Sequence, residues 1–138
     1  MIYGLDSSVA IKWFIREADT DKALRLRDEY LQGIHRLLSP DVFPFEIAHA
    51  LTRAERQGRI PVQDALKLLA DALNVLPLLH DGLPLLPRAA ELSSQARLGV
   101  YDCLYISLVE RERCKLVTAD QRLANTFPMH TVLLSSLP

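Results

Sequence analysis

Short apolar runs alternate with longer amphipathic stretches along the whole chain. The runs predict β-strands over residues 2–5, 36–39, 75–79, 114–118 and 131–134. Between them, apolar side chains recur every three to four positions, which is typical of helices that bury one face. The expected helices cover residues 8–16, 19–33, 41–57, a stretch opening at Pro61, 87–98, 101–113 and 119–126. Strands that alternate with helices indicate an α/β fold, with a parallel sheet covered by helices on both faces.

Several residues set the expected boundaries of these elements. Asp41 suits the N-cap of the third helix, and Gly33 is a usual stop for the second. Pro77 lacks a backbone N–H, so the strand that contains it belongs at an edge of the sheet. The chain has no internal repeat, low-complexity tract or linker, which predicts one domain over residues 1–138.

Composition and charge restrict the class of protein but do not indicate a function. With 49% hydrophobic and 24% charged residues, the 138-residue chain is an ordinary globular one, expected to be soluble and cytoplasmic. It shows neither a signal-peptide pattern nor an apolar stretch of the ~20 residues that a membrane span needs. Cys103 and Cys114 match no zinc or redox spacing and are expected to be buried free thiols. A net charge of −1 means that nucleic acid could be held only through a local basic patch.

Four acidic residues stand at positions that usually carry apolar side chains. Asp6 and Asp120 each follow a predicted strand directly. Parallel strands end at one edge of a sheet, where ligands bind in such folds, so these two carboxylates should meet. Glu46 and Asp102 fall on the apolar stripes of their helices and should point toward the core.

Carboxylates that converge must either take up protons or bind a cation. Two like charges about 4 Å apart repel by roughly 4 kcal/mol at an effective dielectric constant of about 20. Ligands that are all oxygen favour Mg²⁺ or Mn²⁺ over zinc, and the implied chemistry is metal-assisted phosphoryl transfer or hydrolysis. The alternative is that each acid does local work, as a helix cap or, for Glu46, as an ion-pair partner of Lys12 or Arg53.

The segments around these acids resemble the PIN-domain family, and within it the VapC-type toxins of type II toxin–antitoxin pairs. The motifs that carry the resemblance are Leu5-Asp6-Ser7-Ser8, Phe45-Glu46, Tyr101-Asp102-Cys103-Leu104-Tyr105 and Leu116-Val117-Thr118-Ala119-Asp120. The resemblance implies a three-layer α/β/α sandwich with a mostly parallel central sheet. It also implies a Mg²⁺- or Mn²⁺-dependent endoribonuclease that uses a metal-activated water on RNA such as tRNA or ribosomal RNA. A homodimer and a cognate antitoxin protein are the implied partners.

The family's site positions fall on specific residues of this chain. Asp6, Glu46, Asp102 and Asp120 match the metal-site acids and are the expected catalytic residues. Supporting roles are implied for two hydroxyls: Thr118 beside the site, and Ser7 as a hydrogen-bond donor to Asp6 or to a metal-bound water. Where the family often has a further acid, this chain offers Asn125, which favours one metal ion over two.

Other residues and functions complete the expectations. Lys12, Arg16 and Arg122 follow the first and last motifs and could contact RNA phosphates, unless they are simply solvated surface charges. One rival function is a Mg²⁺-dependent phosphatase or phosphoreceiver with Asp6 as nucleophile, although Ser8 stands where that signature needs a second acid. The other is an inactive PIN-like module that binds RNA or a protein partner without cleavage.

Overall fold

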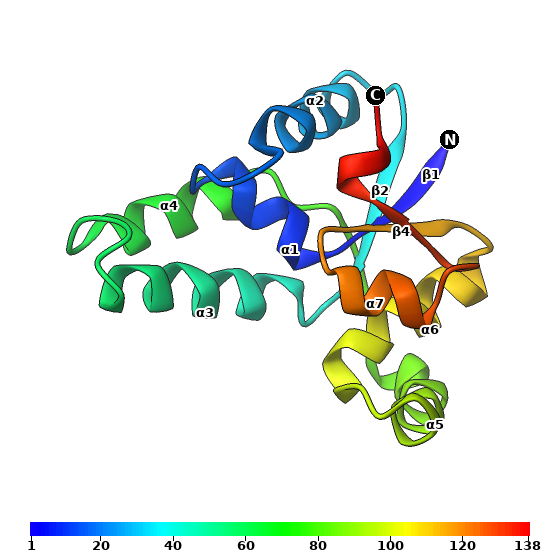
Figure 1. The fold of residues 1–138 in the computed structure, drawn as a ribbon. Helices are drawn as coiled ribbons and strands as arrows, with labels where there is room; N and C mark the ends of the chain where they lie inside the picture. The colour runs from blue at the N-terminus through cyan, green and yellow to red at the C-terminus, as the bar shows by residue number, and fades with distance from the viewer.

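A five-stranded parallel sheet forms the centre of the computed structural model, which describes residues 1–138 (Figure 1). Its strands run in the order β3-β2-β1-β4-β5, and all four neighbouring pairs are parallel. The strands are β1 (Ile2–Leu5), β2 (Arg36–Pro40), β3 (Leu78–His80), β4 (Lys115–Thr118) and β5 (Thr131–Leu133). The predicted parallel α/β architecture is therefore confirmed, and the sheet is parallel throughout.

Helices cover both faces of this sheet. α5 and α6 lie on one face, with α6 packed against β1, β2 and β4, while α1 and α2 lie on the other (Figure 1). α3 and α4 form a hairpin that projects away from the sheet. The helices are α1 (Ser7–Ala10), α2 (Thr20–Leu31), α3 (Phe43–Arg56), α4 (Asp64–Leu73), α5 (Leu86–Ala96), α6 (Val100–Glu112) and α7 (Gln121–Thr126).

The two strands that carry the acidic motifs lie in the middle of the sheet. Leu5 of β1 pairs with Val117 of β4, and both are fully buried, as expected for central parallel strands covered on two faces. From β1 the chain moves outward on one side to β2 and β3, and it later returns to place β4 and β5 on the other side. The carboxyl ends of β1 and β4 thus form the switch point of the sheet, where α/β folds bind ligands.

Two boundaries differ from those expected from the sequence. The third strand covers Leu78–His80 instead of residues 75–79, because Pro77 has no N–H and pairing begins after it. The strand does lie at an edge of the sheet, as predicted. Asp41 is not the N-cap of α3, which is Val42; the Asp41 carboxylate instead accepts a hydrogen bond from the backbone N–H of Gly82.

Smaller differences concern helix starts and thiols. The short helix expected over residues 8–16 is α1 followed by a single 3-10 turn, and α4 begins at Asp64, three residues after Pro61. Both cysteines are free, but only Cys103 is buried, whereas Cys114 is partly exposed just before β4. None of the helices has the length and apolar character needed to cross a membrane.

Candidate active site

The four acids predicted from the sequence gather at the carboxyl edge of the sheet. Asp6 follows β1 at the N-cap position of α1, where its side chain makes no capping hydrogen bond, and Asp120 follows β4 and caps α7. Glu46 and Asp102 come from the first turns of α3 and α6. The pKa of each of Asp6, Glu46 and Asp102 is raised by burial and, in part, by the charge of at least one other of the four acids.

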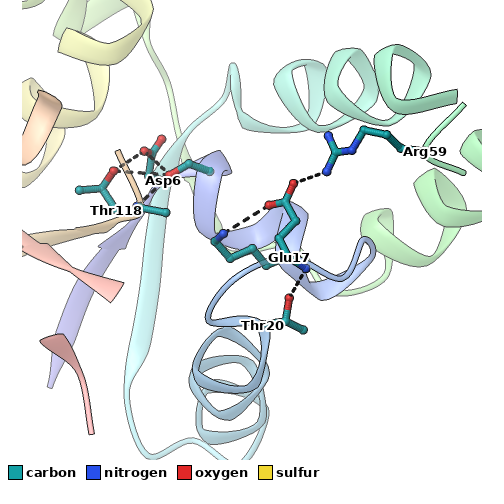
Figure 2. Close-up of polar contacts among 8 residues, drawn as sticks. Asp6, Glu17, Thr20, Arg59 and Thr118 are labelled. Atoms are coloured by element: carbon teal, nitrogen blue, oxygen red, sulfur yellow. Dashed lines mark hydrogen bonds and ion pairs between the residues drawn. The ribbon is translucent and has the colours of Figure 1, made fainter. Parts of the chain in front are cut away.

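Asp6 is the most deeply buried of the four, with 5% of its surface exposed. Thr118 Oγ1 donates a hydrogen bond of 2.6 Å to Asp6 Oδ2, and Ser8 Oγ donates one of 2.7 Å to the same oxygen (Figure 2). Burial raises the pKa of Asp6, the two hydroxyls lower it, and the charge of Asp120 raises it again. The result is a raised pKa for a carboxylate whose orientation is fixed from two sides.

The same two hydroxyls also fix the loop that follows β4. Thr118 Oγ1 accepts a hydrogen bond of 3.0 Å from the backbone N–H of Asp120, and Ser8 Oγ accepts one of 3.0 Å from that of Ala119. The Asp120 carboxylate itself accepts from the backbone N–H of Leu123, so it is a helix cap as well as a member of the cluster. Asp6 and Asp120 are therefore positioned relative to each other through Thr118.

Glu46 is held from α6 and from α1. Tyr105 donates a hydrogen bond of 2.6 Å and Ser7 one of 3.2 Å, both to Glu46 Oε1. Burial is the main cause that raises the pKa of Glu46, and the charges of Asp6 and Asp102 add to it, while the two hydrogen bonds lower it. Burial beside Glu46 also keeps the Tyr105 phenol protonated, because it raises the pKa of that group well above its usual value.

Asp102 differs because no side chain donates a hydrogen bond to it. Burial, followed by the charges of Asp6 and Asp120, raises the pKa of Asp102 to about 6, and Arg122 lowers it only in part. An acid with such a pKa beside two like charges is a group that an added cation would stabilise in its ionised form.

The donor set fits a hard divalent cation. None of the four acids forms an ion pair with a lysine, arginine or histidine, and the charge of Arg122 compensates that of Asp102 only in part. No group of three or more His, Cys, Asp or Glu side chains is arranged so that it could hold a metal ion. An ion beside these acids would therefore have only one or two carboxylates as direct ligands and would keep several water ligands, as Mg²⁺ usually does.

The predicted supporting residues are both at the cleft, with one change of partner. Thr118 lies beside Asp6 as expected. Ser7 does not donate to Asp6; it donates to Glu46, and the Asp6 partner is Ser8. Ser8 and Tyr105 are the site residues that the sequence reasoning missed. Only their spacing in the sequence could have indicated them: Ser8 lies two residues after Asp6, and Tyr105 lies one helical turn after Asp102.

The three cations predicted to contact RNA lie in different settings. Lys12 donates to Glu17, which also accepts from Arg59 (Figure 2), and Arg16 pairs with Asp21 at the surface. The exposed Arg122 donates to the backbone carbonyl of Arg97 and lies near enough to lower the pKa of Asp102. RNA contact by the three cations stays a prediction, and Arg122 is the one whose charge acts on the cleft.

Asn125, which stands where a fifth acid was considered, lies on the exposed side of α7. Its side-chain carbonyl accepts a hydrogen bond of 2.8 Å from Gln121 Nε2. Its amide adds no negative charge to the cluster, so the cleft has the four acids alone.

The chain is similar in sequence to a known protein family and to a curated protein. The family model described as "PIN domain" matches residues 3–126. The chain is 28% identical over 126 residues to Ribonuclease VapC3 of Pyrobaculum aerophilum, covering 90% of this chain and 93% of that protein.

Two solved structures share the fold over almost their full length. A crystallised protein of Pyrobaculum aerophilum aligns with a TM-score of 0.71 at 22% identity, covering 99% of this chain and 94% of the other. A toxin–antitoxin complex from Klebsiella pneumoniae contains a chain that aligns with a TM-score of 0.62 at 13% identity, with coverage of 96% and 97%.

Proposed function

Because this chain belongs to the PIN-domain family, we propose that it is a metal-dependent endoribonuclease, the VapC-type toxin of a toxin–antitoxin pair. The observation that carries the proposal is the set of four carboxylates at the switch point of the sheet, none of which has a basic partner. A relative named as a ribonuclease that aligns over 90% of the chain supports the choice of RNA as substrate.

The roles that we assign follow from how each acid is held. Asp6, fixed by Thr118 and Ser8, and Asp102, which has no other partner, are the direct ligands of Mg²⁺ or Mn²⁺. When bound, the cation lowers the pKa of a water molecule and stabilises the negative charge that develops on the phosphate. Glu46, oriented by Tyr105, and Asp120, oriented by the start of α7, complete the set by holding water ligands or the ion itself.

We further propose two protein partners. A small antitoxin would cover the acidic cleft, in keeping with the toxin–antitoxin complex in which a similarly folded chain is found. A second copy of this chain is the other proposed partner. The RNA would be tRNA or ribosomal RNA, both rich in exposed loops.

The hydrogen bonds of Asp6 weaken the alternative hypothesis of a phosphatase or phosphoreceiver. Ser8, where that signature has a second acid, donates to Asp6 Oδ2, and Thr118 donates to the same oxygen. The position that should supply a second carboxylate therefore supplies a hydroxyl that orients Asp6, and the acid pair of that signature is incomplete.

The test is RNA cleavage by the purified protein with Mn²⁺ present. The wild-type protein is expected to cut, and Asp6→Asn and Asp102→Asn are expected to abolish cutting. Asp71→Asn, an acid exposed on α4, is the matched control and should cut like the wild type. Full activity in excess EDTA, or in either of the two cleft variants, would contradict the proposal. Metal binding without cleavage of any RNA would favour the inactive binding module.

A further inference from the structure

Two exposed aromatic side chains stand next to the acids of the cleft. Phe45 immediately precedes Glu46 on α3, and Tyr101 immediately precedes Asp102 on α6. Phe45 is 75% exposed and Tyr101 is 60% exposed. Neighbouring residues on a helix point about 100° apart, so each ring lies to the side of its acid instead of covering it.

The two rings border the same hollow. It has a volume of about 670 Å³ and is lined by Ser7, Val42, Phe45, Glu46, His49 and Tyr101. That volume lies within the roughly 300–1,000 Å³ range of small-ligand sites. The hollow therefore contains one carboxylate of the cleft and two aromatic rings, with room for a flat group beside them.

Neither ring stacks on another aromatic ring within the protein. The aromatic pairs in contact are Tyr3 with His35 and Trp13 with Phe14. Phe45 and Tyr101 belong to neither pair, although large aromatic rings usually gain most by being buried. Two unstacked rings at the border of one hollow form a surface suited to a planar ligand.

We propose that Phe45 and Tyr101 form a nucleobase subsite, in which the base next to the scissile phosphate stacks. The proposal rests on the proposed ribonuclease function and names the substrate more narrowly: the nucleotide at this position must be unpaired, since a base within a duplex has no free face. The substrate is thus single-stranded or looped RNA at the cut.

The charges that line the hollow favour a nucleobase over a ligand that is held by ion pairs. The lining of the hollow has no lysine or arginine, and its one ionisable acid is Glu46. His49 is the one lining residue that could pair with a phosphate, so most of the lining offers RNA neutral contacts. Stacking on aromatic rings supplies such contacts for any base, because every base has a π-face.

A second hollow shares part of this lining and serves as a control site. It has a volume of about 370 Å³, shares Val42, Phe45 and Tyr101, and is otherwise bordered by Asp41, Gly82, Leu83, Leu86 and Leu104. None of the four acids lines it, whereas Glu46 lines the first hollow. The two hollows can therefore be distinguished by mutating residues that line only one of them.

The first test compares steady-state kinetics of ring variants on a short single-stranded RNA. Phe45→Ala and Tyr101→Ala should each raise KM by roughly 5- to 30-fold, the lower part of the range for losing one stacking ring, with kcat changed by less than about twofold. Phe45→Tyr keeps a ring and should behave like the wild type. Leu83→Ala, at an exposed position of the second hollow only, is the matched control and should leave KM unchanged.

The second test removes the base instead of the ring. RNAs carrying one abasic nucleotide at successive positions around the cut should show one position at which the wild-type KM rises by the same factor. The double variant Phe45→Ala/Tyr101→Ala should be insensitive to the base at that position. Equal sensitivity of the wild type and the double variant would overturn the subsite.

Failure of the subsite and failure of the ribonuclease function can be told apart. If the wild type cuts RNA and the ring variants cut it with the same KM, the function stands and the subsite is overturned. If the wild type cuts no RNA, binding of a fluorescently labelled oligonucleotide is measured instead, and weaker binding by Phe45→Ala supports the subsite alone. If Leu83→Ala weakens oligonucleotide binding as much as Phe45→Ala, the base is not confined to the first hollow and the proposed subsite is overturned.

Discussion

Thr118 is the residue through which the two strand-end acids are linked. Its hydroxyl donates to Asp6 Oδ2 at 2.6 Å and accepts from the backbone N–H of Asp120 at 3.0 Å. Thr118 is fully buried, so no water can replace either bond. The side chain thus positions one acid directly and the other through the backbone.

Thr118→Val keeps the shape of the side chain and removes both bonds. We expect a loss of ~1–3 kcal/mol in the free energy of unfolding, because the backbone N–H of Asp120 loses its partner and Asp6 Oδ2 keeps only the hydrogen bond from Ser8. The pKa of Asp6 should rise further, since a hydrogen bond that lowers it is lost. Urea unfolding measures the first effect. Thr52→Val, whose hydroxyl bonds only to helix carbonyls of α3, is the control and should change stability by less than about 0.5 kcal/mol.

Asp102 makes stability depend on pH in a defined direction. Its pKa is about 6 in the folded protein, compared with an ordinary value of 3.8, so the folded state binds the proton more tightly than the unfolded chain. Without divalent cations, the free energy of unfolding should therefore fall as the pH rises from about 4 to about 6. The pKa values of Asp6 and Glu46 are raised too, so they contribute in the same direction.

Asp102→Asn should remove the part of this pH dependence that belongs to Asp102. At about pH 7 and in EDTA, the variant should be more stable than the wild type, whereas near pH 4 the two should be alike. Urea unfolding at a series of pH values measures this. A variant that is less stable than the wild type at pH 7, or an unchanged slope, would show that Asp102 is not a destabilising charge in the folded cleft.

At the scale of elements, the contact between β1 and α6 sets the distance between Asp6 and Asp102. Gly4 allows this contact, because a Cβ atom at that position would collide with Val109 Cγ1 and approach Leu116 Cδ1 to 3.1 Å. Val109 and Leu116 are both fully buried. β1 can therefore lie directly against α6 only with glycine at this position.

Gly4→Ala should cost ~1–3 kcal/mol in the free energy of unfolding, the usual range for overpacking a core. It should also reduce RNA cleavage, because β1 and α6 carry Asp6 and Asp102. Val109→Ala added to Gly4→Ala opens space and should recover part of the stability. Gly99→Ala is the control: φ is −62° and no atom lies within 4 Å of the added Cβ, so only the small preference for Gly over Ala at the N-cap of α6, less than about 1 kcal/mol, should be lost. A Gly4→Ala protein as stable as the wild type would refute the close contact.

Most elements could be predicted from the sequence because their apolar periods are clear. The first strand was predicted at the observed residues, and the acids at the ends of β1 and β4 followed from the rule for parallel sheets. The predicted bounds of the third strand were wrong because apolar residues such as Leu76 and Leu79 stand on both sides of Pro77, so hydrophobicity alone does not show where the strand begins. Asp41 was misassigned because a good capping residue can equally bond to a distant loop, here at Gly82.

Hydrogen-bond partners within the cleft were the part that the sequence could not give. Ser7 and Ser8 are adjacent and chemically identical, and only the course of α1 decides that Ser7 reaches Glu46 and Ser8 reaches Asp6. Tyr105 belongs to the apolar stripe of α6 by its spacing, and its phenol end meets Glu46 only because α3 lies opposite. Long-range packing, rather than local pattern, determines these partners.

At the scale of the whole molecule, negative charge is concentrated where the chain is least able to neutralise it. The net charge is only −1, and several surface acids pair with basic residues, as Glu91 and Glu110 do with Arg88. The four cleft acids have no such match and are contributed by four separate elements. A cation at the cleft would therefore connect parts of the molecule that otherwise repel one another.

Isothermal titration calorimetry with Mn²⁺ at about pH 7 tests this central claim most directly. The wild-type protein is predicted to bind the ion, Asp6→Asn to bind more than about tenfold more weakly, and Asp71→Asn to bind like the wild type. Lowering the pH below 6 should weaken binding, since Asp102 then holds a proton. Absence of Mn²⁺ binding by the wild type, or equal affinity in Asp6→Asn, would contradict a metal site built from these four acids.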